Sequence, residues 1–248
     1  FSLAKIKAET LPSFNNWKPL KIFTSLSNAR KSVPIFSIRY QGQEVAELIA
    51  NDTVLLNITK RHEANNMKCF GLKTTSQEIE WKKASDFRKL FAELDKSINK
   101  PMKMKSDEAW LQSIIFDSMV KEGTSGYRAC QPVVFAEGFP MQCPVPISAS
   151  SGVPKQHKGN LDILSRRGQG GTHPAIWELK KPKTCGTALE QSYIYGVTLA
   201  LMLRSSGGDT WYRNMGFTKG LGKSRLTIDI IVTISNDREN ELLNHLNV

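Results

Sequence analysis

Two short stretches decide how the second half of this chain is interpreted: Lys158-Gly-Asn-Leu-Asp-Ile-Leu164 and, further on, Trp177-Glu-Leu-Lys-Lys-Pro182. Side chains alternate between the two faces of a β-strand, so Glu178 and Lys180 are expected on one side and Leu179 on the other. If the glycine-rich segment between the stretches returns the chain as a hairpin, Asp162 comes beside Glu178. The pattern therefore predicts two carboxylates and a lysine at one place on a sheet.

Such a cluster has a specific chemistry. Two neighbouring carboxylates repel each other unless a cation lies between them, and hard oxygen ligands select Mg²⁺, for which Mn²⁺ can substitute. A nearby ammonium, here that of Lys180, can assist the attacking water or steady the charge on a phosphate. These are the requirements for hydrolysing a phosphodiester. The plain alternative is that Glu178 and Lys180 form a surface ion pair on a strand.

The motifs around this cluster resemble the PD-(D/E)xK nuclease superfamily, in its RecB and lambda-exonuclease branch. Gly159-Asn-Leu-Asp162 is similar to the first motif of that branch, and Glu178-Leu-Lys180 is similar to the second. The branch also has a Gln-x-x-x-Tyr element on the following helix, which Gln191-Ser-Tyr-Ile-Tyr195 resembles. Residues four apart share one face of a helix, so Gln191 and Tyr195 can reach the same edge.

The resemblance implies a role for each of these residues. Asp162 and Glu178 are expected to bind the metal, with the Leu179 carbonyl as a third ligand and Lys180 assisting the water. Gln191 and Tyr195 are expected to position the substrate. The family also implies an acidic residue on the preceding helix, for which Glu108 is the candidate; alternatively, Glu108 is a solvated charge in a first helical turn.

The remaining expectations for the site concern the substrate. Three lysines flank the motifs and are expected to contact a nucleic-acid backbone or, in the plainer interpretation, to keep the rim soluble: Lys158, Lys181 and Lys183. DNA is the expected substrate, although the sequence separates neither DNA from RNA nor endonuclease from exonuclease. Asp229 lies in an apolar stretch, and the sequence does not decide its role.

Periodicity and charge divide the chain into two expected domains, 1–105 and 106–248, joined by Lys100-Pro-Met-Lys-Met-Lys105. The first is expected to be β-rich, with strands between residues 33 and 73, one of them at 69–72, and a helix over 85–98. The second is expected to be a restriction-endonuclease-like mixed sheet flanked by helices, so the fold class is mixed α/β. Its helices are expected from residue 106 to about 120, over 187–204 and over 237–246.

The formal net charge is +11, and its distribution is uneven. Residues 1–105 contain 19 Lys and Arg against 10 Asp and Glu, whereas residues 106–248 contain 15 against 13. A basic surplus suits a polyanionic partner. The first domain is therefore expected to hold DNA or, equally, to dock a protein partner.

Composition narrows the protein class. No stretch approaches 18 uninterrupted apolar residues, so no membrane span is expected. The four cysteines show neither a zinc-module spacing nor a disulfide framework, which favours free thiols in a reducing intracellular compartment, cytoplasm or nucleus. Two functions remain: a metal-dependent deoxyribonuclease, or a catalytically inactive nuclease fold that acts as a nucleic-acid-binding, effector or assembly module.

Overall fold

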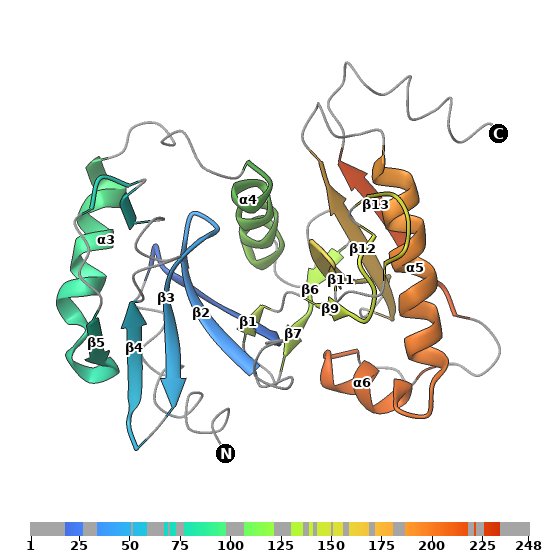
Figure 1. Ribbon diagram of the computed structural model, residues 1–248, viewed down its shortest axis with the longest axis horizontal. Helices are drawn as coiled ribbons and strands as arrows, with labels where there is room; N and C mark the ends of the chain where they lie inside the picture. The colour runs from blue at the N-terminus through green and yellow to red at the C-terminus, as the bar shows by residue number, and fades with distance from the viewer. Residues whose placement is uncertain are drawn as a thin grey trace. The chain divides into compact units, whose positions relative to one another are not determined.

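A computed structural model of the chain shows two compact units, residues 1–113 and 114–248. Each unit contains a β-sheet and helices (Figure 1). The structure describes residues 18–26, 34–50, 52–58, 67–68, 70–72, 77–97, 107–121, 130–135, 139–140, 143–149, 151–155, 159–168, 172–180, 187–217, 221 and 226–233. The division lies within a helix, a few residues after the expected linker at 100–105.

The first unit contains a five-stranded antiparallel sheet whose strands follow one another in sequence order. Its strands are β1 (Lys21–Leu26), β2 (Pro34–Tyr40), β3 (Gln43–Ala50), β4 (Val54–Ile58) and β5 (Gln77–Glu80). The β2–β3 connection has two residues, Gln41 and Gly42, with φ of 48° and 82°. Tight hairpins require this left-handed conformation, which glycine adopts at little cost. The expected β-rich first unit is confirmed.

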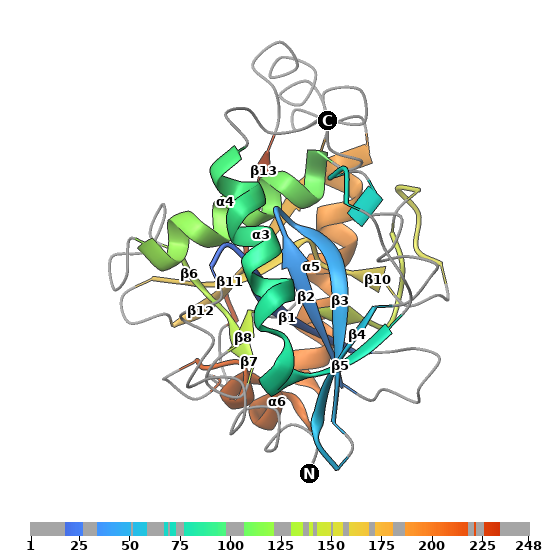
Figure 2. The same ribbon diagram turned by 90° about the vertical axis from the view of Figure 1, so that its left-hand side faces the viewer.

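Helix α3 (Ser85–Ser97) lies along one face of this sheet (Figure 2). The single-turn helix η2 (Trp81–Lys83) precedes it. Aromatic rings form the contact between the helix and the sheet. The ring centroid of Phe91 on α3 lies 5.1 Å from that of Tyr40 on β2. The Tyr40 hydroxyl donates to Asp95 Oδ1 at 3.1 Å, and burial raises the pKa of Tyr40 above its usual value. This apolar face explains the helical periodicity of the segment.

A strand expected at 69–72 is absent from the described part of that segment. Phe70, Gly71 and Leu72 instead follow a helical turn, since their amides donate to the carbonyls of Met67 and Lys68 at 3.0–3.1 Å. Gly71 has a φ of 75°, which ends such a turn. The run of apolar residues was too short to distinguish a strand from a helical turn.

Helix α4 (Asp107–Lys121) spans the division between the units. Two long polar contacts tie its first half to the first unit. Lys21 Nζ donates to Ser113 Oγ and Arg39 Nη1 donates to Gln112 Oε1, both at 3.4 Å. The helix that the sequence predicts to open the second domain therefore begins as part of the first unit.

The second unit is built on a mixed four-stranded sheet in the order β13-β12-β11-β6. Its strands are β6 (Cys130–Pro132), β11 (Ile163–Arg167), β12 (His173–Leu179) and β13 (Asp229–Thr233). β11 is antiparallel to β12 and β6, and β12 is parallel to β13. Short strand pairs lie beside it: β7 (Val134–Phe135) with β8 (Phe139–Pro140), and β9 (Pro144–Val145) with β10 (Gly159–Asn160).

Helix α5 (Ala188–Arg204) forms the crossover between β12 and β13 and packs against both strands. A parallel pair needs such a crossover, and the sequence predicts this helix over 187–204. A shorter helix that the sequence did not reveal, α6 (Gly208–Asn214), follows. The amphipathic helix expected at 237–246 lies outside the described residues. Mixed α and β structure is thus confirmed for the chain.

Two cysteines of the second unit are described, and both are buried free thiols, as the sequence predicts. Burial raises the pKa of Cys143 to about 12 and also raises that of Cys130. Cys69 and Cys185 lie outside the described residues. None of the described helices is long and apolar enough to cross a membrane.

Candidate functional site

The pairing of β11 with β12 brings Asp162 beside Glu178. The two strands are antiparallel, with Ile163 opposite Trp177, and continuing this register by one residue places Asp162 opposite Glu178. The Asp162 side chain is fixed there, because its Oδ2 accepts a hydrogen bond from the Leu179 amide at 2.8 Å. The antiparallel return that the sequence predicts for these two segments is therefore present.

Glu178 and Lys180 contact each other at the end of β12. The Lys180 ammonium donates to Glu178 Oε1, so both side chains lie on the same side of the chain, as strand alternation predicts. The Glu178 side chain is 0% exposed and that of Lys180 is 12% exposed. A surface ion pair is thus wrong for these residues. A buried carboxylate needs a cation nearby, and here the ammonium supplies that charge.

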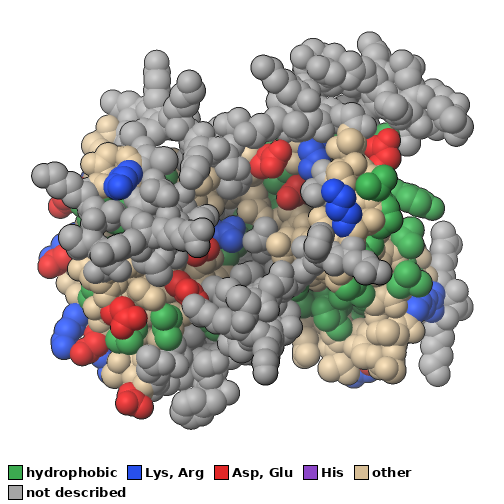
Figure 3. Space-filling view, viewed as in Figure 1, with side chains coloured by type: hydrophobic (Ala, Val, Ile, Leu, Met, Phe, Trp, Pro, Cys, Tyr) green, Lys and Arg blue, Asp and Glu red, His purple; other side chains and the backbone are tan. Residues whose placement is uncertain are grey.

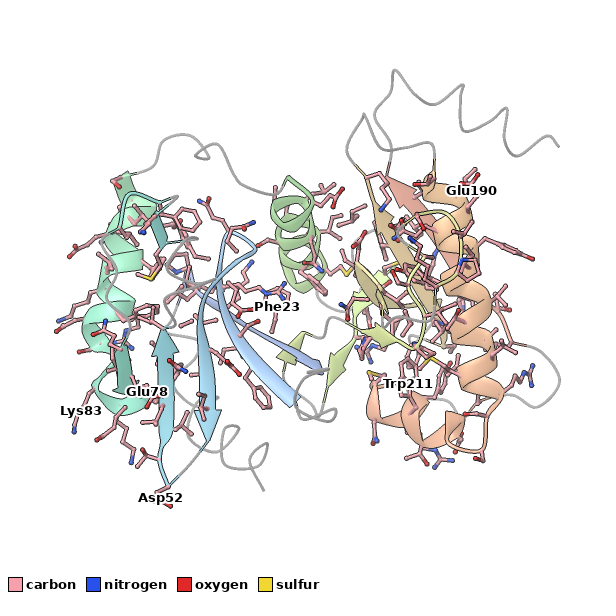
Figure 4. The ribbon with its side chains drawn as sticks, in the orientation of Figure 1. Phe23, Asp52, Glu78, Lys83, Glu190 and Trp211 are labelled. Atoms are coloured by element: carbon pink, nitrogen blue, oxygen red, sulfur yellow. The ribbon has the colours of Figure 1, made fainter. Side chains whose placement is uncertain are left out.

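The Glu178 side chain points toward α5. A Cβ atom on Gly196 of α5 would lie 3.3 Å from Cδ1 of Ile230, so the sheet face that bears Ile230 lies against this helix. Ile230 pairs with Ile176 on β12, and neighbouring residues of paired strands share a face. Alternation then places Glu178 on that face too. Side chains fill the space between β12 and α5 (Figure 4).

The two polar residues predicted on α5 lie on its buried side, but they differ in their contacts. The Tyr195 hydroxyl accepts a hydrogen bond from the Ala149 amide at 3.3 Å, and the side chain is 2% exposed. Gln191 is buried as well, and its Oε1 has no hydrogen-bond partner among the described residues. Tyr195 therefore braces the loop after β9, whereas Gln191 presents an unused acceptor.

Gly159 explains why two of the sequence motifs occur together. A Cβ atom at this position would lie 2.4 Å from the Ile147 carbonyl oxygen and 2.9 Å from the Tyr195 hydroxyl. Only glycine fits at a position of β10 that lies this close to the Ile147 backbone and the Tyr195 hydroxyl. The glycine of the first motif and the tyrosine of the third thus pack together and hold the segment that leads into Asp162.

The donor set suits a divalent cation. Asp162 and Glu178 supply two adjacent carboxylates, the chemistry that Mg²⁺ and Mn²⁺ prefer. Within the described ranges no three His, Cys, Asp or Glu side chains gather into a metal-holding group. Asp162 and Glu178 are two such side chains, and the third expected ligand of the second unit is a backbone group, the Leu179 carbonyl.

The roles expected for all of these site residues stay predictions, and four of the residues are not part of the geometry above. Glu108 lies on α4 within the first unit, and its role as a ligand stays a prediction. The three lysines expected to line a nucleic-acid groove lie outside the described residues: Lys158, Lys181 and Lys183.

Asp229 belongs to a different cluster at the opposite end of β12. It pairs with Ala175, whereas Glu178 pairs with Val232 further along the same two strands. Its Oδ2 lies 2.8 Å from His173 Nε2 and 3.4 Å from Arg167 Nη1. The sequence did not reveal this cluster, because its members come from three strands and share no local spacing.

Comparisons with known proteins gave no match: no family model, no curated protein and no solved structure matches the chain.

Proposed function

We propose that this protein is a Mg²⁺-dependent nuclease that hydrolyses phosphodiester bonds of DNA, on a restriction-endonuclease-like fold. One observation carries the proposal: the Leu179 amide holds the Asp162 carboxylate beside Glu178, and Lys180 contacts Glu178. The hydrolysis of a phosphodiester needs a metal site and a positive charge near the phosphate. The carboxylates of Asp162 and Glu178 can supply the first, and the ammonium of Lys180 can supply the second.

Each residue of the cluster has a distinct role in this proposal. Asp162 and Glu178 hold the cation, together with the Leu179 carbonyl. The cation, when bound, would neutralise charge on the phosphate and help to form hydroxide near neutral pH. Lys180 orients the attacking water and stabilises the negative charge that develops on the phosphate oxygens.

Burial strengthens these effects. The Glu178 and Lys180 side chains are largely out of solvent, where charge interactions are screened less than in water. Gln191 Oε1, on the helix that covers this face, is an acceptor without a partner among the described residues, and it can accept a hydrogen bond from Lys180 or from a water molecule. The positive surplus of the first domain would attract the polyanionic substrate.

A cleavage assay with matched variants tests the proposal. The full chain is incubated with linear and with closed circular DNA, in Mg²⁺, Mn²⁺ or EDTA. We expect metal-dependent cleavage that falls by at least about 10²-fold in Asp162→Asn and Lys180→Met. Lys155→Ala is the control, because Lys155 is an exposed lysine of the same unit outside the cluster. Cutting of closed circles would identify an endonuclease.

The competing function predicts a different pattern. An inactive nuclease fold would bind DNA with no cleavage in any metal, and the Asp162→Asn variant would bind as well as the original protein. Cleavage that persists in both site variants would also contradict the proposed site. RNA substrates in parallel reactions would decide which nucleic acid is cut.

A further inference from the structure

Helix α5 is apolar on two opposite faces. Its inner face is buried against the sheet and includes Tyr195, Leu199 and Leu203. Its outer face exposes three large apolar side chains, Tyr193 at 67%, Val197 at 43% and Leu201 at 68%. We call these three the outer stripe. A helix with one face against its core normally presents polar groups outward, so the outer stripe marks an interaction surface.

The outer stripe and its flanking charges are arranged symmetrically about Val197. Tyr193 and Leu201 lie four positions before and after Val197, and exposed Glu190 and Arg204 lie seven positions before and after it. At 3.6 residues per turn all five fall within an arc of about 80°. Figure 3 shows green side chains in a row over α5, between a red group at its upper end and a blue group at its lower end. Figure 4 shows Glu190 at that upper end.

We propose that the outer stripe is the interface of a homodimer in which α5 packs antiparallel against α5 of a second copy, with the two-fold axis at Val197. This arrangement places Tyr193 against the partner's Leu201 and Glu190 against the partner's Arg204. Each contact then occurs twice, as a two-fold interface requires.

The pattern favours a second copy over an unrelated partner. A different protein places no requirement of symmetry on the face it binds, whereas a self-complementary dimer needs apolar residues and opposite charges at equal distances from its axis. The stripe and its flanking charges extend over about 21 Å, so the interface falls at the small end of specific interfaces and the dimer is expected to be weak.

The proposed dimer uses the face of α5 opposite the candidate active site. Gln191 and Tyr195 point to the buried side of α5, opposite the outer stripe. The dimer and the proposed nuclease activity are thus independent, and either can fail without the other.

Sedimentation equilibrium of the full chain tests the dimer, over about 5–500 µM. We expect the average mass to rise with concentration from 27.8 kDa toward twice that value. Leu201→Glu should keep the protein monomeric across the range. Lys82→Glu reverses an exposed charge on the first unit and should dimerise as the original chain does.

Charge reversal tests the pairing itself. Glu190→Arg or Arg204→Glu alone should raise the dimer dissociation constant by about tenfold, because like charges then meet at both ends of the interface. The double variant Glu190→Arg/Arg204→Glu restores opposite charges and should recover most of the association. Circular dichroism and the unfolding midpoint of each variant verify that it folds.

Cross-linking gives a second readout. In Val197→Cys the introduced thiols face each other at the axis and should form a disulfide-linked dimer under mild oxidation, whereas Arg213→Cys on α6 should not. A protein that is monomeric throughout the range overturns the proposal, as does a dimer that is insensitive to the charge reversals and to Leu201→Glu. Coverage of the outer stripe by another part of the same chain would produce the monomeric result.

Discussion

The substitution Gly159→Ala is predicted to destabilise the second unit severely. The added Cβ atom would lie 2.4 Å from the Ile147 carbonyl oxygen, whereas ordinary contacts begin at 3.4 Å, so the backbone must move by about 1 Å. Both sides of the contact are held. Gly159 pairs with Val145, and the loop after Ile147 is closed by the Ser148–Lys155 bridge.

The expected loss follows from these contacts. Overpacking costs about 1–3 kcal/mol, and weakening the β9–β10 pairing or the hydrogen bond from Ala149 to Tyr195 costs about 0.5–1.5 kcal/mol. We therefore expect the free energy of unfolding to fall by about 2–4 kcal/mol. Urea titration of the full chain, followed by tryptophan fluorescence and circular dichroism, measures this change.

Two further variants make the test specific. Gly207→Ala adds a Cβ with no atom within 4 Å and should change stability by less than about 1 kcal/mol. Tyr195→Phe removes the hydroxyl 2.9 Å from the added Cβ but not the carbonyl oxygen. The double variant Gly159→Ala/Tyr195→Phe should therefore lose less free energy of unfolding than the two single variants together, by about 0.5–1 kcal/mol. A Gly159→Ala protein whose free energy of unfolding is within about 1 kcal/mol of the original would show that this close approach is not required for stability.

Three more predictions concern the buried groups. Lys180→Met removes the ammonium that competes with a metal for Glu178, so Mn²⁺ affinity by calorimetry should rise even as cleavage is lost; an unchanged or weaker affinity would contradict the shared site. Cys143, whose pKa is about 12, should resist alkylation at pH 8 in the folded protein and react in urea. Because folding raises the pKa of this thiol, it contributes stability that is fully present below the unfolded thiol pKa of about 8.5 and is lost as pH rises toward 12. The urea midpoint should therefore fall between these two pH values. Cys143→Ala should weaken this fall. Phe91→Ala should lower the stability of the first unit by about 3–5 kcal/mol, and hydrogen exchange of β2–β4 amides should report it.

The elements with strong periodicity could be predicted from the sequence. The helix at 85–97 was predictable because it buries one face, and that requirement appears as regular apolar spacing. The strand expected at 175–179 lies in β12 (His173–Leu179), which is buried from Pro174 to Leu179. The neighbouring positions of Asp162 and Glu178 were predictable for a related reason: a short antiparallel return fixes which residues lie opposite each other.

The features that join segments distant in sequence could be seen only in the tertiary structure. The burial of Glu178 and the orientation of its side chain toward α5 require the parallel strand β13 and the crossover helix. The close approach of Gly159 to Tyr195 and the cluster around Asp229 join segments with no shared spacing. Local propensity cannot report such contacts, because they form only when the chain folds and distant side chains compete for the same space.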